Sequence, residues 1–191
     1  MRELEERILK DGEVLPGDVL KVGVFLNQQI DVPFMMDLGR EIARRFAGER
    51  VTKILTVEAS GIALAFAAAS AMGLPMVFAK KHKSSNVGGG VYRAKVHSYT
   101  HGTDNEIVIG FAYLNQKDRV LIVDDFLANG CAMRGLIALA EQAGAGVAGC
   151  AAAIEKGFQG GGDALRREGI RVESLAIIER MDDHSLTFRA E

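Results

Sequence analysis

The chain has 191 residues, and its 23 lysines and arginines nearly balance 25 aspartates and glutamates. That length fits one domain burying about 70% of its unfolded surface, and the balanced charge argues against a nucleic-acid partner, which needs a basic surface. The two cysteines, Cys131 and Cys150, are too few for the disulfide framework of a small secreted protein, so we expect a reducing compartment.

The apolar stretches of the sequence are short. Residues 1–10 are rich in charge and contain no apolar core of a signal peptide. Residues 62–72 form the longest apolar stretch, which is too short to cross a bilayer. We therefore expect a cytoplasmic protein with no membrane partner.

In chain order, hydrophobic periodicity predicts strands that alternate with helices. The expected helices are residues 2–10, 32–46, 62–72, 131–143 and 163–167. The expected strands are residues 53–57, 75–79, a run from Val120, 147–154, 172–178 and 185–189, with a hairpin of 96–99 and 107–113. No period is evident in residues 14–30 and 81–95.

This alternation predicts an α/β fold with a doubly wound, mostly parallel twisted sheet flanked by helices. We expect a single domain over residues 1–191, with a core of about 32–154 and a smaller hood from about 1–31 and 155–191.

One glycine pattern is misleading. Residues 144–149 (GAGVAG) satisfy the dinucleotide pattern G-x-G-x-x-G, but a helix precedes them and a strand follows. We therefore interpret Gly144 as the end of a helix.

The segment VLIVDDFLANGCA, residues 120–132, combines a buried strand, two acids and a helix start. Asp124 and Asp125 follow the strand at its carboxyl end, where open α/β sheets bind ligands, and we expect Asp125 to face solvent. The bend that follows offers backbone N–H groups to a phosphate, from Ala128, Asn129, Gly130, Cys131 and Ala132. A nucleotide-hydrolase strand would need a G-x-x-x-x-G-K-S/T loop, which the chain lacks. A buried strand followed by an Asp N-cap is the other alternative.

This segment resembles the phosphoribosyl pyrophosphate (PRPP) motif of type I phosphoribosyltransferases. The resemblance implies that the acidic pair holds the ribose 2′ and 3′ hydroxyls and that the bend binds the 5′-phosphate. Asn129 and Ala132 stand where that family commonly has hydroxyl residues. We therefore expect phosphate binding to depend mainly on backbone N–H groups and on the helix terminus.

A second turn, Glu58-Ala59-Ser60-Gly61, leaves a predicted core strand and starts a helix. The resemblance implies that Glu58, Ala59, Ser60 and Gly61 form the pyrophosphate loop, whereas the alternative is an ordinary turn with Ser60 as N-cap. Lys81 is expected to help neutralise pyrophosphate. Residues 84–95 match the position of the family's mobile loop, or are simply a flexible surface loop.

The remaining candidates concern the base. The strings VLKV, FLN and QID near the N-terminus resemble bacterial xanthine phosphoribosyltransferases, as do VFAKKHK, IEKGFQ and RVESLA later in the chain. The resemblance implies that the main chain at Leu20, the Asn27 side chain and Lys156 contact the base. Lys156 would donate to a 6-oxo group, and Asn27 would read the 2-oxo group of xanthine. From the residues alone, Asn27 could equally be a turn residue.

The resemblance implies transfer of the phosphoribosyl group from PRPP to N9 of xanthine, as in purine salvage. It also implies Mg²⁺, held mainly by PRPP and water rather than by a protein ligand set, and a homodimer. One alternative is a hypoxanthine-guanine phosphoribosyltransferase with the same machinery. The other is a PRPP-sensing transcription regulator, for which the sequence shows no basic face.

Overall fold

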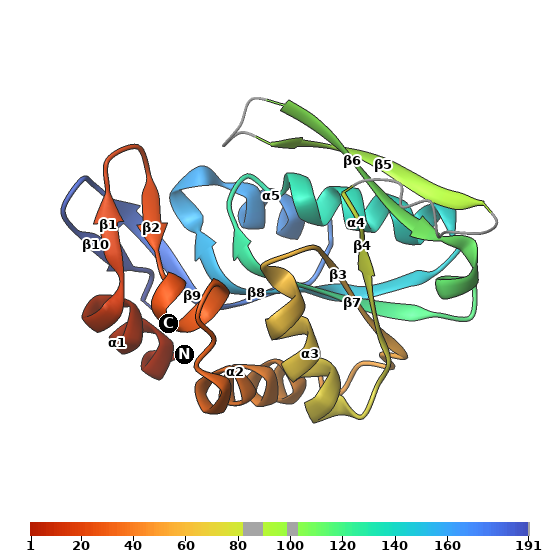
Figure 1. The fold of residues 1–191 in the computed structure, drawn as a ribbon, viewed down its shortest axis with the longest axis horizontal. Helices are drawn as coiled ribbons and strands as arrows, with labels where there is room; N and C mark the ends of the chain where they lie inside the picture. Colours follow the sequence, from red (N-terminus) through yellow and green to blue (C-terminus); the bar gives the residue numbers. More distant parts are fainter. Residues whose placement is uncertain (82–89, 99–102, 191) are drawn as a thin grey trace.

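A six-stranded sheet forms the centre of the computed structural model, which describes residues 1–81, 90–98 and 103–190 (Figure 1). The strand order is β10-β9-β8-β7-β3-β4, and every neighbouring pair is parallel except β9 and β10. The strands are β3 (Lys53–Val57), β4 (Met76–Ala79), β7 (Arg119–Leu127), β8 (Gly146–Lys156), β9 (Val172–Met181) and β10 (Leu186–Phe188). The predicted α/β class with a mostly parallel sheet is confirmed.

Helices cover both faces of this sheet (Figure 1). One face packs against α1 (Arg2–Asp11), α2 (Val32–Arg45) and α3 (Gly61–Met72), and the other against α4 (Cys131–Gln142) and α5 (Gly161–Arg167). In β7, Leu121 and Val123 belong to the first core, whereas Val120 and Ile122 belong to the second. Both faces of the strand are therefore buried, as its apolar run predicts.

Helices α2 and α3 show how local sequence positions the site. Asp31 caps α2 by accepting a hydrogen bond from the backbone N–H of Phe34. A Cβ on Gly39 of α2 would lie 2.4 Å from the backbone carbon of Ala67 in α3, so only glycine permits this close approach. Gly73 ends α3 in a left-handed conformation with φ 66°. This packing fixes the first turn of α3 at the carboxyl edge of the sheet.

The N-terminal segment, residues 1–31, contains more regular structure than predicted. Strands β1 (Glu13–Leu15) and β2 (Val19–Lys21) form an antiparallel hairpin, and a π-helical turn, Gly23–Asn27, follows. The expectation of irregular structure over residues 14–30 was therefore wrong. Strands of three residues are too short to produce a recognisable sequence period.

A second hairpin, β5 (Val91–Ser98) and β6 (Thr103–Gly110), lies over α4 (Figure 1). It begins earlier than predicted, so residues 91–95 are strand rather than aperiodic loop, while residues 84–89 of the expected mobile loop lie outside the described residues. Short 3₁₀ turns occur at Phe111–Tyr113 and Gly157–Gln159. Strands β9 and β10 extend the main sheet beyond residue 154. The boundary between core and hood stays a prediction.

Two smaller expectations concern α4 and membranes. Gly144 follows α4 with φ 69°, and β8 begins at Gly146, so the glycine pattern follows a helix and runs into a strand, which is the predicted order. Within the described ranges, no helix has the length and hydropathy needed to span a membrane.

Candidate active site

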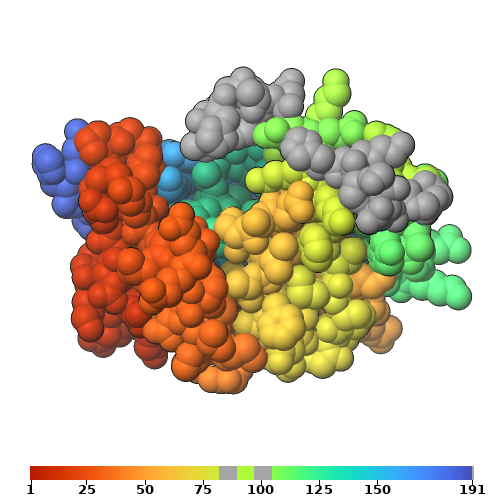
Figure 2. Space-filling view, in the orientation of Figure 1, coloured from red at the N-terminus to blue at the C-terminus, as the bar shows by residue number. Residues whose placement is uncertain are grey.

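A cleft of about 620 Å³ lies at the carboxyl ends of β3, β7 and β8. The N-terminal segment, red to orange in Figure 2, forms one of its sides. The predicted site residues that line the cleft are Leu20, Asn27, Glu58, Ser60, Lys81, Asp124, Asp125, Ala128, Asn129, Cys131, Ala132 and Lys156. Parallel strands bring these distant positions together because their carboxyl ends share one edge of the sheet.

Asp125 is the most highly connected of the predicted acids. Asn27 donates from Nδ2 to Asp125 Oδ2 at 2.9 Å, and Ser60 donates from Oγ to Asp125 Oδ1 at 2.9 Å. Only 5% of the surface of Asp125 is exposed, so the expectation that it faces solvent was wrong. Its carboxylate instead joins the π-helical turn, the Glu58–Gly61 turn and the end of β7.

Asp124 is equally buried, and its environment disfavours the charged form. Burial, reinforced by the neighbouring Asp125 carboxylate, raises the pKa of Asp124 well above its ordinary value, although Lys81 opposes this shift. Asp124 Oδ1 accepts a hydrogen bond of 3.0 Å from the backbone N–H of Asp125. The acidic pair can therefore hold a proton, so one carboxyl can donate while the other accepts.

The Glu58–Gly61 turn leads from β3 into α3 and contains a cis peptide bond between Glu58 and Ala59. Ser60 makes no side-chain cap to α3, so the ordinary N-cap interpretation was wrong, and its hydroxyl bonds Asp125 instead. Glu58 Oε1 accepts from the backbone N–H of Lys81 at 2.7 Å, which joins the turn to the end of β4.

Gly61 lies where the turn meets the acidic pair. A Cβ on Gly61 would lie 2.5 Å from Thr56 Oγ1 and 2.6 Å from Asp124 Oδ1. Distances this short would force the β3–α3 turn away from the carboxylates. Glycine at this position therefore lets the predicted pyrophosphate turn pack directly against the predicted ribose site.

The bend that was predicted to bind a phosphate joins β7 to α4. Gly130 adopts φ 84°, and Asn129 Oδ1 accepts from the backbone N–H of Cys131 at 3.1 Å. The start of α5 supports the bend, because Gly161 donates its backbone N–H to the Ala128 carbonyl at 3.1 Å. The N-terminus of α4 thus opens on the cleft beside the acidic pair.

Lys156 at the end of β8 also lines the cleft. Its Nζ donates to the main-chain carbonyl of Asp18 at 2.6 Å and lies 5.6 Å from the centre of the Phe126 ring. Burial lowers the pKa of Lys156 from its ordinary value. Leu20 is buried beside the β1–β2 turn. The base candidates therefore come from the N-terminal segment and from the end of β8.

Sequence reasoning missed a buried ion pair under Lys156. The Glu155 carboxylate is 0% exposed and accepts from both terminal nitrogens of Arg166, at 2.9 and 2.7 Å. Ser174 also donates to Glu155. The sequence offered no usable pattern for this pairing. Asp18, whose φ of 61° places it in the left-handed region, could have been found from the Pro-Gly-Asp turn.

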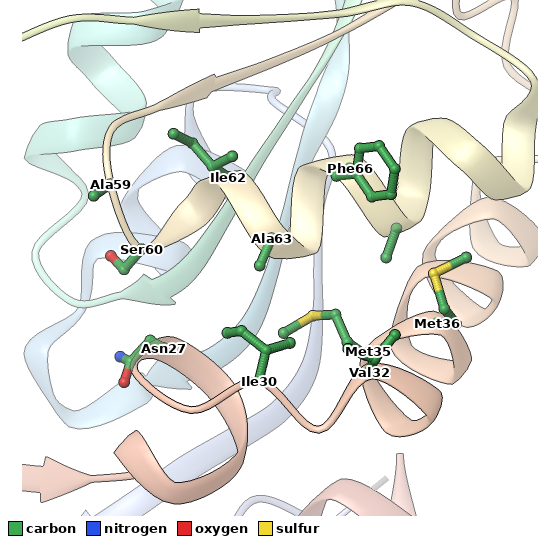
Figure 3. A pocket seen from close by; sticks show the side chains of 11 residues that line it. Asn27, Ile30, Val32, Met35, Met36, Ala59, Ser60, Ile62, Ala63 and Phe66 are labelled. Atoms are coloured by element: carbon green, nitrogen blue, oxygen red, sulfur yellow. The ribbon is translucent and has the colours of Figure 1, made fainter.

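Ala59 lines a different pocket from most of the candidates. This pocket, of about 510 Å³, lies between α2 and α3, and shares Asn27 and Ser60 with the main cleft. Figure 3 shows apolar side chains facing it, among them Met35 and Phe66. Gly61 and Gly130 are not among the residues that line the cleft.

Comparison with known proteins gives the family. Residues 33–173 match the model of the phosphoribosyl transferase domain. The chain belongs to the phosphoribosyltransferase family. A xanthine phosphoribosyltransferase of Bacillus cereus (strain AH187) is 52% identical over 188 residues, or 98% of this chain and 95% of that protein. One from Bacillus anthracis (strain A0248) matches to the same extent.

Solved structures of more distant phosphoribosyltransferases share the fold. The APRTase of Giardia lamblia complexed with 9-deazaadenine superimposes with a TM-score of 0.78 at 20% identity, over 93% of this chain and 98% of that one. The adenine phosphoribosyltransferase of Thermoanaerobacter pseudethanolicus gives a TM-score of 0.73 at 21% identity, over 91% and 98%. At these identities the similarity concerns the fold alone.

Proposed function

We propose that this phosphoribosyltransferase acts on xanthine, transferring the 5-phosphoribosyl group of PRPP to N9 and releasing pyrophosphate, as in purine salvage. The observation that carries this proposal is a single cleft lined by the acidic pair, by the phosphate bend and by Lys156. Full-length similarity to proteins named xanthine phosphoribosyltransferase supports the choice of base.

The phosphoribosyl end would hold PRPP through three groups of contacts. Asp124 and Asp125 would bind the ribose hydroxyls, and the backbone N–H groups of residues 128–132 would bind the 5′-phosphate. The Glu58–Gly61 turn and Lys81 would face the pyrophosphate. The two turns are held by hydrogen bonds within the fold, so their backbone donors would need little reorganisation to stabilise developing charge.

The reaction breaks the bond between the anomeric carbon and pyrophosphate, which leaves with the electron pair. N9 of the base forms the new bond, and the base loses a proton. The ribose ring gains positive charge as the old bond breaks, and the neighbouring Asp125 carboxylate would stabilise that charge. Catalysis then depends on positioning and electrostatics rather than on a protein nucleophile.

Mg²⁺ fits this site as a substrate-bound ion. Across residues 1–81, 90–98 and 103–190, no three His, Cys, Asp or Glu side chains are grouped to hold a metal. Asp124 and Asp125 are the carboxylates that could contact it, through water. When bound to PRPP, Mg²⁺ would neutralise the pyrophosphate charge.

The base end would select an oxopurine. The Lys156 ammonium can donate to a 6-oxo group but not to the 6-amino group of adenine. Asn27 would read the 2-oxo group, which xanthine has and hypoxanthine lacks. Because Lys156 treats all 6-oxopurines alike, a hypoxanthine-guanine phosphoribosyltransferase is the second candidate.

The test is nucleotide formation by purified protein with PRPP, Mg²⁺ and each of xanthine, guanine, hypoxanthine and adenine. We expect xanthine to give the highest kcat/KM. A guanine preference of more than about tenfold, equivalent to ~1.4 kcal/mol, would retire the xanthine assignment. Light scattering tests the accompanying proposal of a homodimer.

A further inference from the structure

Asn27 connects the two ends of the cleft. It belongs to the π-helical turn of the N-terminal segment, yet its Nδ2 donates to Asp125 Oδ2 on β7 at 2.9 Å, across 98 positions of sequence. The proposed function gives these two residues different tasks, reading the base and holding the ribose. Their hydrogen bond therefore joins the two tasks in the protein without substrates.

Asp125 lines the cleft but is almost completely covered in this arrangement. Only 5% of the residue is exposed, while Asn27 and Ser60 donate to its two oxygens. A ribose hydroxyl that binds those oxygens would compete with the two donors for them. The charged or partly charged acceptor makes such a bond costly to break without replacement.

Of the two donors, Asn27 is the less restrained. Ser60 lies in the turn held by the close packing of Gly61 against Thr56 and Asp124. Asn27 ends a five-residue turn and is followed by two exposed residues, Gln28 and Gln29. A ribose hydroxyl that takes its place on Asp125 would release the Asn27 amide into the same cleft, which both residues line.

We propose that Asn27 couples the two substrates: it bonds Asp125 before PRPP binds, and PRPP releases it to bond the 2-oxo group of the base. The inference rests on the proposed function. Its consequence is reciprocal, because a ligand that frees Asn27 tightens base binding by the same factor by which the base tightens that ligand.

Calorimetric titration of xanthine, with and without saturating ribose 5-phosphate, measures this coupling without turnover. Ribose 5-phosphate carries both ribose hydroxyls and should tighten xanthine binding about tenfold, within the usual range of coupling between sites. Inorganic phosphate fills only the bend and should leave xanthine affinity unchanged. Hypoxanthine has no 2-oxo group, so ribose 5-phosphate should tighten it less than about threefold.

The Asn27→Ala variant separates coupling from a purely structural role. Removing the amide frees Asp125, so the variant should bind ribose 5-phosphate as tightly as the unmodified protein or a few-fold more tightly. A residue that merely orients Asp125 would instead weaken ribose 5-phosphate binding when removed. Gln29→Ala, an exposed neighbour on the same segment, is the matched control and should keep the full coupling.

Weaker ribose 5-phosphate binding by Asn27→Ala, or equal coupling for xanthine and hypoxanthine, overturns the inference. These outcomes are distinguishable from failure of the proposed function, which is the absence of xanthine nucleotide formation from PRPP. An active protein without the coupling refutes only the role of Asn27.

Discussion

The phosphoribosyl end of the cleft is formed largely by one stretch of chain, whereas the base end is assembled from separated segments. Asp124, Asp125 and the phosphate bend follow one another within residues 124–132. Leu20 and Asn27 come from the N-terminal segment and Lys156 from the end of β8, and they meet only in the folded chain. The first end is held by local geometry, and the second by tertiary contacts. Mutations should therefore affect the two ends in different ways.

The largest effect is expected for the buried ion pair next to Lys156, between Glu155 and Arg166. Arg166→Met leaves the buried Glu155 carboxylate without its bidentate partner, so the free energy of unfolding should fall by about 3–5 kcal/mol. Denaturant unfolding measures the loss. Arg134→Met, which removes an exposed ion pair with Glu168, is the control and should cost about 0–1 kcal/mol. Equal effects of the two changes would contradict the role of the buried pair.

At the phosphoribosyl end, Asp125→Asn should remove turnover but preserve the fold. The side chain keeps its size, but it loses the charge that faces the ribose and half of its acceptor capacity toward Asn27 and Ser60. We expect kcat/KM to fall about 10²–10³-fold, as for loss of one preorganised contact, with circular dichroism unchanged. The exposed Asp183→Asn change is the matched control. Normal activity in Asp125→Asn would refute the ribose role.

Lys156→Ala should weaken binding of the base without changing binding of the phosphoribosyl group. Loss of a charged hydrogen bond to the base should raise the KM for xanthine by about 10- to 100-fold, or ~1.5–3 kcal/mol. Ribose 5-phosphate affinity, measured by calorimetry, should not change. Lys21→Ala, an exposed lysine of β2, serves as the control. A parallel loss of ribose 5-phosphate affinity would show that Lys156 supports the whole cleft.

The smallest effect concerns Asp124 and depends on pH. Its raised pKa keeps a proton in the folded state that the unfolded chain releases above about pH 3.9. The stability contributed by the protonated form is therefore present at low pH and lost as pH rises through the folded pKa. Asp124→Asn escapes this loss, so its melting temperature should rise relative to the unmodified protein as pH increases.

Above the folded pKa of Asp124, the free energy of unfolding is lower by about 1.4 kcal/mol for each pH unit by which that pKa is raised. Differential scanning calorimetry at a series of pH values checks the trend, with Asp183→Asn as control. A constant difference between Asp124→Asn and the unmodified protein across pH would mean that burial does not disfavour the Asp124 carboxylate.

Much of the fold followed from local patterns. The apolar run of β7, the Asp31 cap of α2 and the glycine after α3 each act within a few residues, so the sequence revealed them directly. The β1–β2 hairpin was missed because each strand has three residues, and the early start of β5 was hidden in a glycine-rich basic stretch. Short strands gain their stability from pairing, which a linear pattern does not display.

The sequence by itself determined which side chains would gather at one edge of the sheet, because parallel strands end together and the 120–132 segment has a recognisable form. Only the tertiary structure decided the state of those side chains. Asp125 is covered by Asn27 and Ser60, Asp124 is desolvated, and Glu155 is paired with Arg166. Burial and hydrogen bonding depend on the three-dimensional neighbours of an atom, and Asn27 and Asp125, for example, lie 98 positions apart in the chain.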